Sequence, residues 1–247
     1  MLVSHNPCLF RNIAYHRINS ITTTRKREIL KAAMDNKGDN KSHNKKIKIL
    51  ALHGKGSSSK EIEKALMPLY DNNYNNSNLL KNNIEIDYLD APHENGQWWL
   101  LPPGKRSFTA DTYIGFEESD KLVTSISSDY DMLFGHSQGA ILLVALLSLG
   151  KIKPKTMVLN GVAWPNPYTN ELEILKLHND KMKILFITGR KDKINPPNTQ
   201  ERVKESLMEA GINNISTIYH NNGHSVPIIN DDGARDDVID WIVTNLL

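Results

Sequence analysis

One short stretch of the chain has the spacing of an activated serine. Residues 135–139 read Gly-His-Ser-Gln-Gly, a G-x-S-x-G pattern centred on Ser137. Residues 130–134 before it predict a strand, and the apolar run 140–149 after it predicts a buried helix. Glycine at two positions lets the two elements pass closely, so the turn between them lifts the serine hydroxyl out of the sheet. We therefore expect Ser137 to be a nucleophile.

A serine hydroxyl is a poor nucleophile until a base removes its proton, and three histidines follow the serine in the chain. His178 falls in a polar stretch and is expected to be solvated. His220 ends the predicted strand 215–219, whereas His224 lies in the loop that follows this strand. A loop at the carboxyl end of a strand holds a side chain over the sheet edge, so we favour His224 as the base.

The base needs a carboxylate that fixes its tautomer and stabilises its charged form. Asp192 lies just past the predicted strand 183–188 and upstream of His224, which gives the order serine, acid, histidine. The alternative is an ordinary surface aspartate among lysines. We expect Asp192 to be the acid, because Asp111 precedes the serine and fits this order badly.

Two backbone N–H groups are candidates to stabilise the negative charge on an attacked carbonyl oxygen. Gln138 follows the nucleophile, and Lys55 lies in the glycine-rich loop 53–57 after the first predicted strand. We assign an oxyanion hole to these two residues. The same loop does not fit the phosphate-binding pattern G-x-x-x-x-G-K-[ST], because its lysine directly follows the first glycine.

Three ring side chains are candidates for substrate contacts. Trp98 and Trp99 lie in an irregular segment and could either wall an acyl pocket or pack the loop onto the sheet. We expect one to point outward and one inward, and we add His136, which stands beside the nucleophile. The H-x-x-x-H spacing of His220 and His224 could suggest zinc, but the pair lies in a loop with no evident third ligand, so we expect no metal site.

Strand-like and helix-like segments alternate along residues 47–247. This alternation predicts an α/β fold with a mostly parallel central sheet and helices on both faces, in which the chemistry lies at the carboxyl ends of the strands. The predicted strands are 47–52, 84–89, 130–134, 156–159, 183–188 and 215–219, and the predicted helices are 60–70, 117–127, 140–149, 199–210 and 236–246.

Composition is typical of a globular body. Of 247 residues, 39% are hydrophobic and 23% are charged, and the net charge of +2 is too small to argue for a nucleic-acid partner. With one cysteine, Cys8, no intramolecular disulfide can form, which fits a reducing compartment. The most apolar run, 140–149, is shorter than the roughly 20 residues of a membrane span, so we expect no stable membrane insertion.

The N-terminal segment differs from this body. Residues 1–27 contain arginine and lysine with serine and threonine between them, but no Asp or Glu, and residues 35–46 are nearly all polar or glycine. A basic, acid-free, hydroxyl-rich segment is typical either of an organelle transit peptide or of a disordered basic tail. We therefore separate a tail and linker, 1–46, from the domain 47–247, and expect a cytoplasmic or mitochondrial location.

Taken together, the serine motif, the loop 53–57 and the segments around Asp192 and His224 resemble the eukaryotic family serine hydrolases (FSH), relatives of the ovarian-cancer-associated gene 2 protein. The resemblance implies the α/β-hydrolase fold and a cofactor-free esterase or thioesterase with Ser137, Asp192 and His224 as its triad. The chain departs from the family at Lys55 and His136, where apolar or aromatic residues are expected, which bears on substrate preference more than on chemistry. The matching stretches are 52–54, 90–93, 98–99, 113–115, 130–140, 189–197 and 223–227.

The sequence thus predicts a serine hydrolase that cleaves a small carboxylic ester or thioester through an acyl-enzyme intermediate. Two alternatives remain open. One is a lysophospholipase or acyl-protein thioesterase, which shares the serine motif, and the other is a non-catalytic binding protein with a hydrolase fold. The sequence fixes neither the natural substrate nor the oligomeric state.

Overall fold

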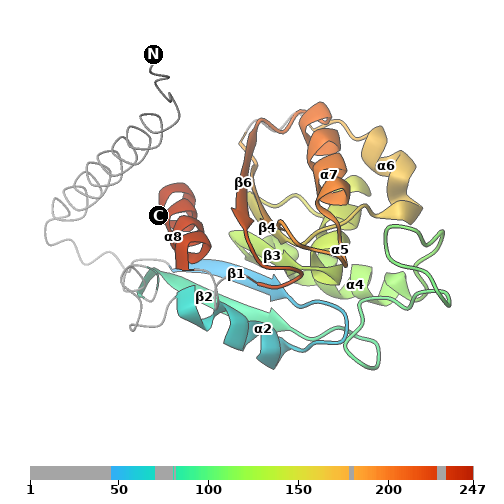
Figure 1. Cartoon of the computed structure of the whole chain (residues 1–247), viewed down its shortest axis with the longest axis horizontal. Coiled ribbons are helices and arrows are strands. Elements are labelled where there is room, and N and C mark those ends of the chain that lie inside the picture. The colour runs from blue at the N-terminus through green and yellow to red at the C-terminus, as the bar shows by residue number, and fades with distance from the viewer. Residues whose placement is uncertain (1–45, 70–79, 81, 178–180, 227–231, 247) are drawn as a thin grey trace, which may run out of the picture. The chain divides into compact units, whose positions relative to one another are not determined.

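The computed structural model describes residues 46–69, 80, 82–177, 181–226 and 232–246 of the chain. Within them one six-stranded sheet forms the centre of the domain (Figure 1). Each of the six predicted strands is confirmed, with bounds that differ by no more than two residues. The strands are β1 (Ile47–Leu52), β2 (Ile84–Leu89), β3 (Met132–His136), β4 (Thr156–Asn160), β5 (Lys183–Gly189) and β6 (Asn214–His220).

The strands lie in the order β2-β1-β3-β4-β5-β6, and every neighbouring pair runs parallel. The prediction of a mostly parallel sheet is confirmed. Every residue of β4 is buried, because helices cover both faces of a parallel sheet, and this explains the nearly continuous apolar run in its sequence. The loops that follow β1, β3, β4, β5 and β6 leave from the same edge of the sheet, where side chains distant in sequence can meet.

Helices cover both faces of the sheet, as predicted. Figure 1 shows α2 and α8 on one face and α4, α5, α6 and α7 on the other. None of the described helices is long and apolar enough to cross a membrane. The α-helices are α2 (Ser59–Leu66), α4 (Phe116–Ile126), α5 (Gln138–Ser148), α6 (Thr169–Glu173), α7 (Pro197–Glu209) and α8 (Asp232–Leu246), and the 3-10 turns are η1 (Met67–Leu69), η2 (Ser127–Asp129) and η3 (Asn166–Tyr168).

Helix α5 forms the centre of the core. All of its residues are buried, which confirms the prediction of a helix that is apolar nearly all round. It packs directly behind β3, so the serine that joins these two elements is held between two buried segments. The short pair η3 and α6 was not predicted, because their lengths of three and five residues leave no measurable helical period.

The burial of α5 gives a test of the core. Leu146 is fully buried there, so Leu146→Ala removes packed atoms and leaves a cavity, and we expect the free energy of unfolding to fall by about 2–5 kcal/mol. Denaturant unfolding measures this. Lys121→Ala, at an exposed position of α4, is the control and should change stability by no more than about 0.5 kcal/mol. A similar small change for both variants would contradict this packing.

Candidate functional site

The turn between β3 and α5 holds Ser137 in an unusual backbone conformation. Its φ is 53° and its ψ is −116°, a region that residues other than glycine rarely occupy. Two backbone hydrogen bonds hold the turn. The Ser137 N–H donates to the Asn160 carbonyl at 2.9 Å, and the Ser137 carbonyl accepts from the Ile141 N–H at 3.0 Å. The serine is therefore fixed at the strand-to-helix junction that the sequence predicts.

The two glycines of the motif are required by close backbone contacts. A Cβ on Gly135 would lie 2.6 Å from the Ala140 Cα, and a Cβ on Gly139 would lie 2.7 Å from the His53 carbonyl oxygen. Neither separation is tolerated between real atoms. The motif therefore brings α5 close to β3 on one side and to the end of β1 on the other.

The loop after β5 holds a buried carboxylate. The Asp192 side chain is 1% exposed, and its Oδ1 accepts N–H bonds from Ile194 at 2.8 Å and Asn195 at 2.9 Å. Burial by itself would raise the pKa of Asp192, but the hydrogen bonds from His224 and from these two N–H groups outweigh it and lower the pKa below its usual value. The carboxylate is therefore ionised and can act as an acceptor.

His224 joins this carboxylate to the serine. Its Nδ1 lies 2.7 Å from Asp192 Oδ2, and its Nε2 lies 2.7 Å from Ser137 Oγ. Because an ionised carboxylate only accepts, the Nδ1 carries the proton, and Nε2 is left to accept from the serine hydroxyl. The structure thus brings the three residues singled out in the sequence into one hydrogen-bonded chain. Such a chain can remove the serine proton and store it on an imidazole ring.

His136 packs against His224 at the side of this chain. Its ring centroid lies 5.1 Å from that of His224, and its Nδ1 lies 2.6 Å from the Asn160 Nδ2. The same amide nitrogen donates to the Ser225 carbonyl at 3.2 Å, which identifies it as the NH₂ group, so His136 Nδ1 accepts. Burial, and then the neighbouring His224, lower the pKa of His136 to about 3. The ring therefore stays neutral beside the base.

A cavity of about 280 Å³ opens in front of the serine. Both residues assigned to the oxyanion hole, Gln138 and Lys55, line it together with Ser137. Gln138 is the first residue of α5, where N–H groups have no partner inside the helix and the helix dipole favours negative charge. The other lining residues are Leu101, Lys105, Arg106, Ser107, Ile141, Ile194 and Asn195.

The assignment of Trp98 and Trp99 to substrate contacts needs correction. Both are 0% exposed and neither lines the cavity, so the expectation that one points outward is wrong. The Gln138 side chain pins this segment, accepting from the Trp98 N–H at 2.9 Å and donating to the Trp99 carbonyl at 3.0 Å. The Trp99 ring stacks on Tyr113 with centroids 4.2 Å apart. His136, the third proposed contact, is also absent from the cavity lining.

Two asparagines support the site although the sequence analysis did not single them out. Asn160 ends β4 and holds both His136 and the carbonyl next to His224. Asn195 caps Asp192 with its backbone N–H, and its side chain donates to the Gly161 carbonyl at 2.7 Å. Two sequence signals could have identified them. Asn160 is a polar residue at the end of a buried strand, and Asn195 is an amide three residues after the acid.

Sequence comparison places the chain among known hydrolases. A family model described as "Serine hydrolase (FSH1)" matches residues 42–233. The chain belongs to the FSH1 serine hydrolase family. No curated protein matches it at the sequence level.

Solved structures show that this FSH1 family member has the α/β-hydrolase fold. Arabidopsis thaliana SOBER1 superposes with a TM-score of 0.61 at 19% identity, over 82% of this chain and 100% of SOBER1. Esterase PE8 gives a TM-score of 0.61 at 18% identity, over 83% and 95% of the two chains. Zea mays acyl-protein thioesterase 2 gives 0.56 at 18% identity, over 85% and 97%.

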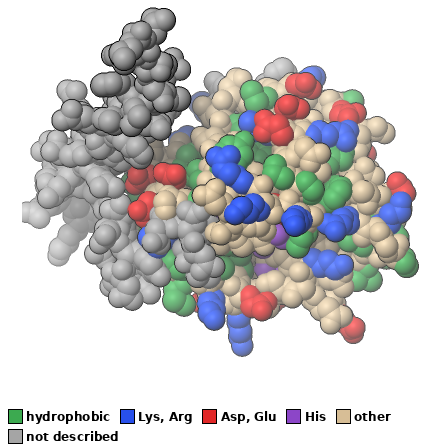
Figure 2. Space-filling view, viewed as in Figure 1, with side chains coloured by type: hydrophobic (Ala, Val, Ile, Leu, Met, Phe, Trp, Pro, Cys, Tyr) green, Lys and Arg blue, Asp and Glu red, His purple; other side chains and the backbone are tan. Residues whose placement is uncertain are grey.

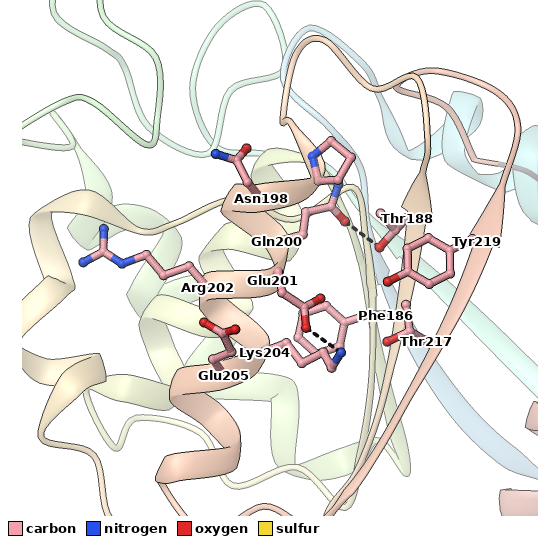
Figure 3. Close-up of a pocket in the computed structure, with 11 residues that line it drawn as sticks. Phe186, Thr188, Asn198, Gln200, Glu201, Arg202, Lys204, Glu205, Thr217 and Tyr219 are labelled. Atoms are coloured by element: carbon pink, nitrogen blue, oxygen red, sulfur yellow. Dashed lines mark hydrogen bonds and ion pairs between the residues drawn. The ribbon is translucent and has the colours of Figure 1, made fainter.

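A larger cavity of the FSH1 family member has none of Ser137, His224 and Asp192 in its lining. It measures about 450 Å³ and lies between α7 and the strands β5 and β6 (Figure 3). Its polar side chains already bond one another, as Thr188 Oγ1 does to Gln200 Oε1 at 3.0 Å and Lys204 to Glu201 at 2.7 Å. It holds no nucleophile with a base, so the smaller cavity is the candidate site.

The described residues of the enzyme contain no group of three His, Cys, Asp or Glu side chains placed to hold a metal ion. His224 has both ring nitrogens engaged, one with Asp192 and one with Ser137, which leaves no lone pair for a metal.

The neutral His136 predicts a specific acid sensitivity. Its folded pKa of about 3 lies below the ordinary value of 6.5, so the unfolded chain binds a proton below pH 6.5 that the folded chain refuses. Stability should therefore fall as pH drops, by about 2 kcal/mol or less between pH 6.5 and 5. His136→Phe should remove this part, measured as a smaller drop in melting temperature over the same interval. An equal drop in both proteins would contradict the assignment of a neutral His136 ring.

Proposed function

We propose that the enzyme hydrolyses carboxylic esters or thioesters with Ser137 as nucleophile, His224 as base and Asp192 as the acid that orients the base. The supporting observation is the unbroken hydrogen-bonded chain from carboxylate to imidazole to hydroxyl, with both links at 2.7 Å. The FSH1 family match supports the class of chemistry, since its members are described as serine hydrolases. The chain meets the geometric requirement that nucleophile and base lie within hydrogen-bond reach.

In the first half of the reaction, Ser137 Oγ attacks the carbonyl carbon while its proton moves to His224 Nε2. Asp192 stabilises the imidazolium that forms, because its ionised oxygen already accepts from Nδ1. The carbonyl oxygen becomes negative and accepts from the backbone N–H groups of Gln138 and Lys55, two residues that line the cavity together with the serine. These donors are fixed before the reaction, so they need little reorganisation.

In the second half, the leaving oxygen or sulfur takes the proton from His224, and the acyl group stays bound to Ser137 as an ester. Water then enters, gives a proton to the same imidazole, and attacks the acyl carbon. Collapse of that intermediate returns the proton to Ser137 and releases the carboxylic acid. Each step uses this chain's own side chains and water.

The two alternatives account less well for the site. A lysophospholipase needs an apolar channel for a long acyl chain, whereas the cavity is about 280 Å³ and has three cationic side chains in its lining, Lys55, Lys105 and Arg106. Thioester cleavage remains within the proposal, because sulfur leaves as readily as oxygen. A non-catalytic binding protein would not need the strained turn at Ser137 or its short bond to His224.

Substitution of the nucleophile tests the mechanism. We expect Ser137→Ala to lower kcat for a short p-nitrophenyl ester by about 10³-fold or more, since only binding and oxyanion stabilisation remain. The variant should also lose covalent labelling by a fluorophosphonate probe. Ser128→Ala, at an exposed serine outside the cavity, should keep both the rate and the labelling. Undiminished hydrolysis by Ser137→Ala would refute the mechanism.

We also propose that residues 1–46, of which only Lys46 lies within the described residues, form a targeting tail joined to the hydrolase domain 47–247. Its basic, acid-free composition supports this. Residues 1–46 fused to a fluorescent protein should direct it to mitochondria, and replacing the basic residues Arg25, Lys26 and Arg27 by glutamine should weaken that targeting. A diffuse cytosolic signal from the unaltered fusion would instead favour a cytoplasmic enzyme.

A further inference from the structure

The cavity in front of Ser137 is lined by basic but not by acidic side chains. Lys55 comes from the loop after β1, whereas Lys105 and Arg106 come from the segment between β2 and α4. Among the described residues, no Asp or Glu lines this cavity. Two segments that are far apart in sequence therefore bring three positive charges to one opening. Figure 2 shows several Lys and Arg side chains around the histidine atoms visible on the front of the molecule.

Most of this positive charge is not neutralised by protein groups. Arg106 Nη1 donates to the Ile194 carbonyl at 2.9 Å and the Lys193 carbonyl at 3.3 Å, which are neutral acceptors, so the guanidinium keeps its full charge. Lys105 lies 3.8 Å from Asp111, but the Asp111 side chain is 83% exposed, and such a pair is weak. Lys55 is exposed, and no ion pair to it is found within the described residues.

Apolar and polar lining residues complete the cavity. Leu101, Ile141 and Ile194 supply an apolar wall near the serine. An apolar wall next to an uncompensated cationic rim fits a ligand that has a short hydrocarbon part and an anionic end. Guanidinium and ammonium groups bind carboxylate or phosphate oxygens through charge-assisted hydrogen bonds, which are about twice as strong as neutral ones.

We propose that the substrate carries a carboxylate or phosphate group, which Lys55, Lys105 and Arg106 bind while Ser137 attacks the ester or thioester carbonyl. This inference rests on the proposed function and narrows its substrate class. The anionic group can belong to the acyl part, as in the monoester of a dicarboxylic acid. It can equally belong to the leaving group, as in a phosphate-bearing thiol. Both sources share the same chemistry at the rim.

Two pairs of substrates separate these sources in the full-length enzyme. The first pair is p-nitrophenyl hydrogen succinate and its neutral methyl ester, which differ in charge on the acyl part. The second pair is acetyl-coenzyme A and neutral S-acetyl-N-acetylcysteamine, which differ in charge on the leaving group. We expect kcat/KM to favour the anionic member of one pair by about 10-fold or more at low salt. That preference should shrink at 0.5 M NaCl, since salt screens exposed charges.

Matched variants assign the preference to the rim. Lys55→Gln and Lys105→Gln each keep the length of the side chain nearly unchanged and remove one charge, and the Lys55 variant keeps the backbone N–H. Each should lower the ratio of anionic to neutral kcat/KM by about 3- to 10-fold. Lys121→Gln removes a charge from the exposed surface of α4, outside the cavity lining, and should leave the ratio at its original value.

The outcomes are distinguishable. Equal kcat/KM for both members of both pairs, without salt dependence, in an enzyme that hydrolyses the neutral esters would overturn this inference and leave the proposed function intact. A salt-sensitive preference that Lys121→Gln lowers as much as Lys105→Gln would also overturn it, because the effect would then come from overall charge. If the enzyme hydrolysed none of the four substrates and the fluorophosphonate probe did not label Ser137, the proposed function itself would be contradicted.

Discussion

The geometry of the site depends on the strained backbone at Ser137. A φ of 53° and a ψ of −116° at a residue with a side chain cost on the order of 1–3 kcal/mol. The conformation persists because β3 and the fully buried helix α5 fix both of its ends, and because Gly135 and Gly139 leave no atoms in the way. The packing of the two elements that flank the serine is therefore what holds the hydroxyl in position.

Close backbone packing that requires glycine is also found at the ends of β4 and β5, next to the loop that carries His224. A Cβ on Gly161, whose φ is 58°, would lie 3.1 Å from the His224 Cε1, and a Cβ on Gly189 would lie 2.2 Å from the Gly223 carbonyl oxygen. Glycine at the ends of β4 and β5 thus lets the histidine loop come down onto the sheet edge. Parallel strands supply the common edge, and glycines allow the approach that gives two contacts of 2.7 Å.

The sequence was sufficient to predict the six strands, the longer helices and the chain order of the site residues, but not which side chains around the site are buried. Strands such as β1 and β5 are short, largely apolar segments between loops, so their patterns identify them directly. Trp98, Trp99 and His136 have no such pattern, and whether each faces a cavity or the interior depends on contacts with distant segments. Gln138 illustrates this, because its side chain holds a segment about 40 residues earlier in the chain. Lys55, Lys105 and Arg106 likewise come together at one cavity only when the chain folds.

Ile194 links the carboxylate of the site to one of the basic side chains at the cavity opening. Its N–H donates to Asp192 and its carbonyl accepts from Arg106, so one peptide segment connects the carboxylate behind the imidazole to a guanidinium facing solvent. On the proposed function, a ligand that displaced the guanidinium would pull on the same segment that holds the Asp192 carboxylate in place. Substrate recognition at the cavity opening would then be coupled to the orientation of the imidazole that the proposed mechanism uses as its base.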